Sequence, residues 1–144
     1  MSFFRSRKLA PVTSDFLLEC KDLVRHYGKI KPVDGVSLNL RPHELLSILG
    51  PSGCGKSTLL NLIAGLDEPQ AGEIFIGGEE MSSVHCIVAP ELRRVGMVFQ
   101  DIALFPHLSV FKNVAYGING SKDEKRSRVE EMLKLVELYG SEKK

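Results

Sequence analysis

The sequence has almost no net charge and no long apolar run. Lys and Arg number 19 against 18 Asp and Glu, a formal net charge of +1 at pH 7. Affinity for nucleic acid comes largely from basic contacts with phosphates, so we expect no nucleic-acid partner. No stretch approaches the roughly 20 consecutive apolar residues of a membrane-spanning helix, and residues 1–14 lack the apolar core of a secretion signal. We therefore expect a cytoplasmic protein.

Cysteine is also scarce. The three cysteines are Cys20, Cys54 and Cys86, and no pair has C-x-x-C spacing. This pattern argues against a disulfide framework and a zinc site, and it fits a reducing compartment. For Cys54 we favour a small neutral side chain over a redox sensor, because only an exposed thiolate of lowered pKa reacts readily. His85 and His107 have no carboxylate or thiol at ligand spacing, so we expect them to bind no metal.

The most informative feature present is a glycine-rich loop that matches G-x-x-x-x-G-K-[ST]. It consists of Gly50, Pro51, Ser52, Gly53, Cys54, Gly55, Lys56, Ser57 and Thr58. A phosphate chain needs several backbone N–H groups aimed at it and no Cβ atoms in the way, and glycines meet both needs. A helix beginning near Lys56 would add the positive end of its dipole. The loop therefore predicts a nucleoside triphosphate site rather than a tight turn without a ligand.

The residues at the end of the loop have distinct expected roles. Lys56 can reach the β- and γ-phosphates as a point charge, the Ser57 hydroxyl is placed to ligate Mg²⁺, and Thr58 adds a backbone N–H. Residues 45–49 before the loop predict a buried strand, and residues 59–64 after it predict a helix. Strand, glycine loop and helix form the setting that the motif requires.

The apolar pattern of the first two thirds of the chain predicts a sheet around one helix. The composition, 43% apolar and 26% charged, is that of a folded globular chain. Residues 16–24 and 36–40 predict two paired strands, and residues 73–76 predict a third. Residues 79–91 predict a surface excursion, after which residues 95–99 predict a short buried strand.

Two helices are predicted toward the end of the chain. Ser109 is a plausible N-cap for a helix through Tyr116, and residues 121–124 have the capping-box form that opens a second helix. Gly140 can end this second helix. Its expected core positions recur at helical spacing and are Val129, Met132, Leu133 and Val136.

Three further features are candidates for function. Tyr27 alone is better explained as a core or edge aromatic, but the phosphate loop downstream favours stacking on an adenine. Gln100 follows a predicted strand, where open α/β sheets bind ligands, so its amide can contact Mg²⁺ or the attacking water. Without further context a solvated strand-end residue is the simpler interpretation. Residues 104–108 are an apolar loop, either a surface for a partner or a segment folded onto the core.

With these features in order, the chain resembles the ATPase subunit of ATP-binding cassette (ABC) transporters over residues 16–138. Residues 95–101, 103–108 and 113–117 are similar to bacterial importers for ferric iron, polyamines, sulfate or maltose. The resemblance implies an α/β fold: a P-loop NTPase core with an N-terminal antiparallel β subdomain and the beginning of a helical subdomain, an incomplete cassette.

The resemblance also implies a domain division and partners. Residues 1–14 would be a flexible N-terminal extension, and residues 15–144 the N-terminal part of an ABC-type ATP-binding domain. The partners would be transmembrane permease subunits, a second ATPase subunit and, indirectly, a solute-binding protein. The protein would be peripheral on the cytoplasmic face of the inner membrane, and the ferric-iron branch is narrowly favoured.

For individual residues the resemblance makes Tyr27 the adenine-stacking aromatic and residues 50–58 the Walker A loop, with ATP and Mg²⁺ as cofactors. Lys56 and Gln100 would be the catalytic residues, Gln100 as the Q-loop glutamine that links Mg²⁺ and the lytic water to the permease. Mg²⁺ would be held by Ser57 and Gln100. Residues 103–116 would lie where the permease docks.

The chain departs from the family in two ways. His43 stands where the family usually has Gly, and it would strain its turn if φ is positive. No L-S-G-G-Q signature, Walker B strand or switch His appears before Lys144. We therefore expect a partial sequence or truncated frame, with little turnover alone and with apolar sheet edges left bare.

Two other functions stay open. A non-catalytic module that binds nucleotide or permease is the main alternative, since the water-activating Glu is missing. Another P-loop enzyme, such as a small GTPase or kinase, is disfavoured because no N-K-x-D motif occurs.

Overall fold

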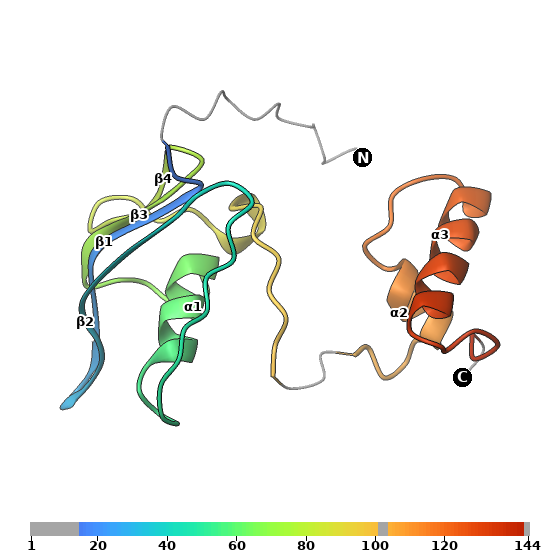
Figure 1. The fold of residues 1–144 in the computed structure, drawn as a ribbon, viewed down its shortest axis with the longest axis horizontal. Helices are drawn as coiled ribbons and strands as arrows, with labels where there is room; N and C mark the ends of the chain where they lie inside the picture. The colour runs from blue at the N-terminus through green and yellow to red at the C-terminus, as the bar shows by residue number, and fades with distance from the viewer. Residues whose placement is uncertain (1–14, 101–103, 143–144) are drawn as a thin grey trace. The chain divides into compact units, whose positions relative to one another are not determined.

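The computed structural model describes residues 15–100 and 104–142. The chain forms two compact units, one ending at Met97 and the other beginning at Val98 (Figure 1). The predicted extension at residues 1–14 lies outside the described residues. Among the helices that the structure describes, none has the length and apolar character needed to cross a bilayer.

The first unit contains a four-stranded antiparallel sheet in the order β2-β1-β3-β4. Its strands are β1 (Leu18–Tyr27), β2 (Ile30–Leu40), β3 (Ala71–Ile76) and β4 (Glu79–Ser82). The predicted pairing of the first two strands is confirmed, with Leu18 opposite Leu40 and Tyr27 opposite Ile30. Gly28, at φ 60°, allows the tight reversal between them.

The predicted surface excursion over residues 79–91 is wrong in its first part. Strand β4 pairs with β3, and Met81 belongs to the same core cluster as Ile74. Ser82 and Ser83 are buried as well. A single apolar residue among Glu and Ser shows no strand pattern, so pairing with β3 decides the conformation here.

Helix α1 (Lys56–Ala64) packs against the sheet and closes the core (Figure 1). The core cluster consists of Cys20, Leu23, Val33, Leu59, Leu62, Ile63, Ile74 and Met81. Burying an aliphatic side chain of this kind contributes about 1.5–3 kcal/mol. Burial also raises the pKa of the Cys20 thiol to about 12, so this thiol stays protonated at neutral pH. A short 3-10 helix, η1 (Pro90–Leu92), follows further along the chain.

One charged side chain, Arg93, is enclosed in this unit with 1% of its surface exposed. Its guanidinium donates to the carbonyl oxygens of Leu62 (3.0 Å) and Ile63 (3.2 Å) in the last turn of α1. It also donates to the Val88 carbonyl (2.8 Å) and the Ser82 hydroxyl (2.7 Å). Carbonyls at a helix end have no partners inside the helix and carry the negative end of its dipole, so Arg93 caps α1.

The predicted buried strands at residues 45–49 and 95–99 are wrong. Both segments run without strand pairing within the described residues. Leu45 and Leu49 are each 91% exposed, and Val98 is 97% exposed. Apolar strands of this kind are buried when strands flank them and helices cover both faces, and the described part of the chain supplies no flanking strand. The predicted bare apolar edges are therefore present.

His43 has a positive φ of 63°, so the condition under which we expected strain in its turn is met. A side chain in the left-handed region costs about 1–2 kcal/mol relative to glycine. The turn is closed by Glu44, whose N–H donates to the Arg41 carbonyl (3.2 Å) and whose carboxylate accepts the Arg41 N–H (2.7 Å). These two bonds hold the turn despite the strain.

The second unit pairs helix α2 (Val110–Ala115) with helix α3 (Lys122–Leu135). The predicted caps are confirmed. The Ser109 hydroxyl accepts an N–H from the first turn of α2, and Ser121 and Glu124 form a reciprocal capping box at α3. These short-range signals therefore placed both helix starts correctly.

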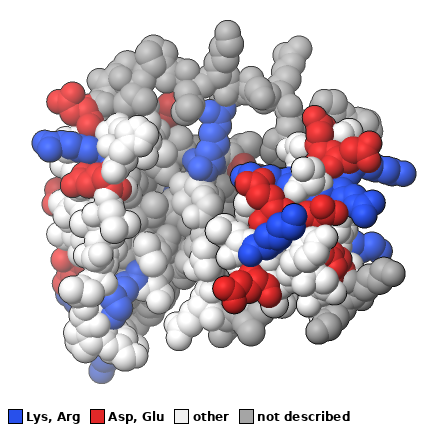
Figure 2. Space-filling model, turned by 45° about the vertical axis from the view of Figure 1, so that its right-hand side comes forward, with Lys and Arg blue, Asp and Glu red and all other residues white. Residues whose placement is uncertain are grey.

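The predicted core positions of α3 are confirmed in part. Val129 and Leu133 are buried and Met132 is half-buried, but Val136 is 58% exposed. Charges of both signs are interspersed on the face of the molecule that Figure 2 shows. Two pairs of this kind lie along α3, Arg126 with Glu130 and Arg128 with Glu131.

The predicted helix end at Gly140 is wrong, because α3 ends before Glu137. Glu137 has φ 58° and donates its N–H to the Lys134 carbonyl (3.2 Å). The N–H of Leu138 donates to the Leu133 carbonyl (2.8 Å). This is the Schellman arrangement, in which the left-handed position is usually glycine. Because this position is a glutamate, a search of the sequence for a helix-ending glycine does not find the end of α3.

Replacing Glu137 with glycine should stabilise the second unit. Glu137→Gly removes the Cβ that disfavours positive φ, and we expect a gain of about 1 kcal/mol in free energy of unfolding. Thermal denaturation followed by circular dichroism measures it. Glu137→Ala keeps the Cβ and should show no comparable gain; equal behaviour of the two variants would contradict the strain at this residue.

Replacing Arg93 should destabilise the first unit strongly. Arg93→Met keeps much of the volume but removes the donors to the Ile63 and Val88 carbonyls and to the Ser82 hydroxyl, at about 1–3 kcal/mol for each buried group left unsatisfied. Urea denaturation measures the loss. Arg41→Met, at an exposed arginine of the same unit, is the control, with an expected change below about 1 kcal/mol. Similar losses for both variants would rule out the capping role.

Candidate functional site

The glycine-rich loop, residues 50–58, runs directly into α1. Gly53 and Gly55 have φ of 80° and 98°, values that side chains disfavour. A Cβ at position 55 would lie 1.9 Å from the carbonyl oxygen of Pro32. The loop can therefore pack against β2 only because position 55 is glycine.

The Lys56 side chain folds back over the loop. Its ammonium donates to the carbonyl oxygens of Gly50 and Pro51, both at 2.7 Å, and lies 3.4 Å from the Cys54 sulfur. A fixed ammonium charge thus stands within the curl of the backbone. Phosphate oxygens are stronger partners for an ammonium than neutral carbonyls are, because the hydrogen bond is then assisted by both charges.

Helix α1 begins without a side-chain cap. Gly55 occupies the N-cap position and makes no side-chain hydrogen bond to the first turn. The first N–H groups of a helix lack partners inside it and carry the positive end of the dipole. Together with the ammonium of Lys56 and the exposed Ser57, they fit a phosphate chain with Mg²⁺. The donor set of this loop therefore suits the group that its sequence predicts.

Cys54 lies in the loop as an exposed free thiol. A Cβ at Gly50 would come within 2.7 Å of the Cys54 sulfur, so the thiol lies close over a glycine. This contact agrees with the interpretation of Cys54 as a small side chain that fits the loop. Its redox behaviour stays a prediction.

Tyr27 ends β1 and is 45% exposed. Its hydroxyl donates to a carboxylate oxygen of Asp67, a residue in the turn after α1. Arg25 joins the same carboxylate through its Nε (3.1 Å) and a terminal nitrogen (2.7 Å), and its guanidinium carbon lies 4.9 Å from the centre of the Tyr27 ring. Sequence reasoning found Tyr27 but missed Arg25 and Asp67, since no short-range pattern connects residues so far apart.

The Asp67 carboxylate is held in its charged form. Partial burial acts against ionisation, but hydrogen bonds from the Tyr27 hydroxyl, the Glu68 N–H and Arg25 outweigh it and lower the Asp67 pKa. The same turn is tied to β1 by Gln70, whose N–H donates to the Val24 carbonyl (2.8 Å). Tyr27 therefore lies on a strand that hydrogen bonds connect to the turn after α1.

Gln100 is exposed and belongs to the second unit, whereas the glycine-rich loop belongs to the first. Gln100 thus lies in a different unit from Lys56 and Ser57, and its expected role stays a prediction. The flanking Asp101 and Ala103, used in the sequence comparison, lie outside the described residues.

The apolar loop at residues 104–108 is closed by one side chain, Asn113. The Asn113 carboxamide accepts the Phe105 N–H (2.9 Å) and donates to the carbonyls of Phe105 (3.2 Å) and Leu108 (2.9 Å). The Phe105 ring centre lies 4.4 Å from that of Tyr116. Leu104 is 64% exposed, which agrees with a surface loop rather than a buried one. Whether a partner contacts it stays a prediction.

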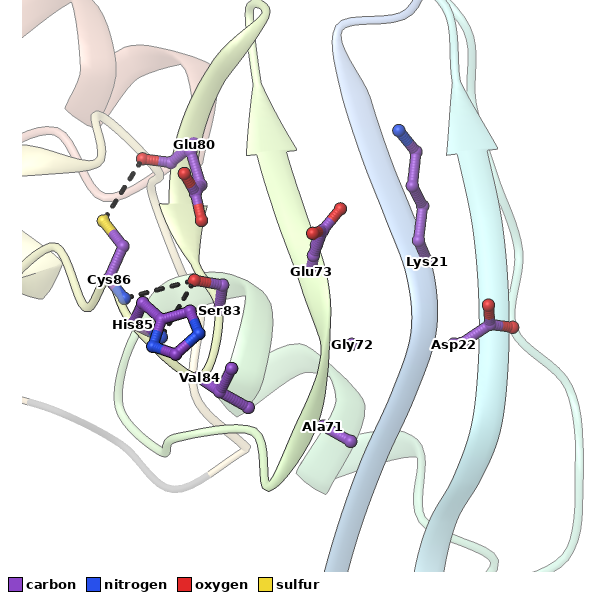
Figure 3. Close-up of a pocket in the computed structure, with 10 residues that line it drawn as sticks. All are labelled: Lys21, Asp22, Ala71, Gly72, Glu73, Glu80, Ser83, Val84, His85 and Cys86. Atoms are coloured by element: carbon purple, nitrogen blue, oxygen red, sulfur yellow. Dashed lines mark hydrogen bonds between the residues drawn. The ribbon is translucent and has the colours of Figure 1, made fainter.

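A groove of about 840 Å³ lies over β1, β3 and β4 (Figure 3). Lys21, Glu73, Glu80 and His85 contribute side chains of both signs to its lining. Ser83 shapes one wall by accepting the N–H groups of His85 and Cys86, both at 3.1 Å. The groove includes no residue of the glycine-rich loop, and its mixed charges select for no particular ligand.

Known proteins with similar sequences are importer components. The profile of the ABC transporter family matches residues 33–144. The spermidine/putrescine import ATP-binding protein PotA of Methylococcus capsulatus is 43% identical over 142 residues, covering 96% of this chain and 36% of PotA. The Fe(3+) ions import ATP-binding protein FbpC of Pasteurella multocida is 42% identical over 132 residues, covering 90% of this chain and 36% of FbpC. The chain thus spans about a third of the length of these relatives.

Solved structures agree with the sequence matches. The ATP-binding cassette MJ0796, in a dimeric post-hydrolysis state bound to ADP and Pi, has a TM-score of 0.71 at 34% identity, over 88% of this chain and 61% of that one. CbiO1 of Clostridium perfringens, part of the ABC transporter complex cbiONQ, has a TM-score of 0.70 at 28% identity, over 91% of this chain and 54% of that one. Because the family profile covers most of a chain whose antiparallel sheet, glycine-rich loop and helices match these cassettes, the chain belongs to the ABC transporter family.

Proposed function

We propose that this chain is the nucleotide-binding part of an ATP-hydrolysing subunit that powers an importer. The observation that carries the proposal is the glycine-rich loop, with the Lys56 ammonium inside its curl and an uncapped helix behind it. In this proposal the backbone N–H groups of the loop and Lys56 hold the phosphates, while the Ser57 hydroxyl holds Mg²⁺. Bound Mg²⁺ would neutralise charge on the phosphate oxygens.

The residues of this chain position the nucleotide rather than activate water. Lys56 orients the β- and γ-phosphates, and the Tyr27 ring stacks on the base. Gln100 would contact Mg²⁺ and the lytic water, as the family resemblance implies. Groups of this kind accelerate a reaction mainly by orienting the substrate and by presenting charges that are already in position for the transition state.

The proposed partners follow from the relatives. MJ0796 is dimeric and cbiO1 is part of a transporter complex, so we include a second ATPase subunit and transmembrane permease subunits. A solute-binding protein would join through the permease. The location is then the cytoplasmic face of the inner membrane, as a peripheral subunit.

For the transported solute we retain two candidate classes. Relatives named for spermidine/putrescine import are 43–47% identical, and those named for Fe(3+) import are 42% identical. This difference does not favour the ferric-iron branch that the sequence pattern suggested. Ferric iron and polyamines are therefore both retained.

Removing the Lys56 ammonium should abolish Mg-ATP binding. Lys56→Ala deletes the charge that lies within the loop, and we expect the dissociation constant to rise at least about 100-fold, since charged hydrogen bonds contribute about 1.5–3 kcal/mol each. Isothermal titration calorimetry measures it. Lys31→Ala, at an exposed lysine on β2, should leave the affinity unchanged. Unchanged affinity in Lys56→Ala would refute the phosphate-binding assignment.

A graded glycine series should separate backbone strain from close packing. Gly96→Ala adds a Cβ with open space and no positive φ, and should be nearly neutral. Gly53→Ala also has open space but φ 80°, and should lose about 1–2 kcal/mol of unfolding free energy. Gly55→Ala adds a contact with the Pro32 carbonyl and should lose more, together with Mg-ATP binding. Equal losses at positions 53 and 55 would contradict the packing of the loop on β2.

A further inference from the structure

Tyr27 and the glycine-rich loop meet on the same hairpin. Tyr27 lies opposite Ile30 at the tip formed by β1 and β2, and the loop packs on β2 through Gly55 and Pro32. The loop thus packs against the same hairpin that carries Tyr27. A ligand whose phosphates occupy the loop therefore has the Tyr27 ring nearby. How that ring is held decides how well it can stack.

The Tyr27 ring is fixed at two points. Its hydroxyl donates to Asp67, and the guanidinium of Arg25 lies over the ring, 4.9 Å from its centre. Arg25 and Tyr27 are two positions apart on one strand, and both side chains reach the same carboxylate. Arg25 thus covers part of the ring, while 45% of the Tyr27 residue remains exposed.

Asp67 is itself fixed in place. It lies in the turn that follows α1, and its side chain is 16% exposed. One of its oxygens accepts the Glu68 N–H at 2.8 Å, while Arg25 contacts both. Gln70 ties this turn to β1 a second time, because its side-chain oxygen accepts the His26 N–H at 2.6 Å. The carboxylate is therefore a rigid anchor for the phenol.

We propose that Arg25 and Asp67 are positioning residues that hold the Tyr27 ring in the orientation in which it stacks on the base of a bound nucleotide. The proposal rests on the proposed function and adds two residues to it. A ring that is already oriented loses little rotational freedom on binding, and this saving raises affinity without a new contact. Among the described residues, neither forms a hydrogen bond, an ion pair or a ring contact with residues 50–58, so we expect the two to act on the base only.

The test compares two ligands on the full-length protein. Mg-ATP engages both the loop and the ring, whereas Mg-tripolyphosphate lacks a base and engages the loop alone. We expect Tyr27→Ala to raise the dissociation constant of Mg-ATP about 5- to 100-fold and to leave that of Mg-tripolyphosphate unchanged. Asp67→Ala should raise the constant for Mg-ATP about 3- to 10-fold, again without affecting the triphosphate.

Two further variants test the route of the effect. Asp67→Ala added to Tyr27→Ala should cause no further loss, because Asp67 acts only through the ring. Asp67→Asn keeps an acceptor for the phenol and should restore part of the affinity. Asp34→Asn is the matched control: its carboxylate lies on the same hairpin and contacts His26 at 2.8 Å, but not Tyr27, so neither ligand should be affected.

The outcomes separate the two proposals. Equal losses for both ligands in Asp67→Ala, unchanged Mg-ATP affinity, or a loss that persists in the Tyr27→Ala background would each overturn the positioning role alone. An unmodified protein that binds neither ligand would overturn the proposed function as well. Loss of Mg-ATP affinity in Asp67→Ala with intact triphosphate binding supports both.

Discussion

The structure depends on one close approach, between the backbone of the glycine-rich loop and strand β2. Position 55 has no room for a Cβ beside the Pro32 carbonyl, and its φ of 98° disfavours any side chain. This contact places the start of α1 against the hairpin that carries Tyr27. The curl of the loop, the position of the Lys56 ammonium and the wall for a base all follow from it. A requirement for glycine at one residue thus organises the whole candidate site.

Helix α1 is held at its far end by polar groups that come from distant parts of the chain. Arg93 occupies its terminal carbonyls, and Asp67 in the next turn binds two side chains of β1. Buried polar groups need hydrogen-bond partners. Here the carbonyls at the end of the helix accept hydrogen bonds from the buried guanidinium of Arg93, so each group satisfies the other. The helix therefore joins the glycine-rich loop at one end to the anchor of Tyr27 at the other.

The features that local chemistry determines could be predicted from the sequence. The glycine-rich loop, the start of α1, the first hairpin and the caps at Ser109 and Ser121 depend on residues within a few positions of each other. Interactions between distant residues could not: Arg93 reaches carbonyls 30 and 31 residues away, and Asp67 meets Tyr27 across 40. The strands expected at residues 45–49 and 95–99 failed for a related reason, because an apolar run forms a strand only when others pair with it. Gln100 was identified from its position after a predicted strand and from the family resemblance, and its role stays a prediction.

The fastening of α1 at both ends also limits how this segment can evolve. An α-helix turns about 100° for each residue, so inserting or deleting one residue would rotate the following turn by that angle. Asp67 would then point away from β1 and Arg93 would lose its carbonyls, although every substitution-sensitive contact in the loop remained intact. Apart from Lys56 and Ser57, the solvent-facing residues of α1 are therefore free to change identity, but the number of residues in the helix is fixed. This arrangement therefore constrains the length of the helix more than its composition.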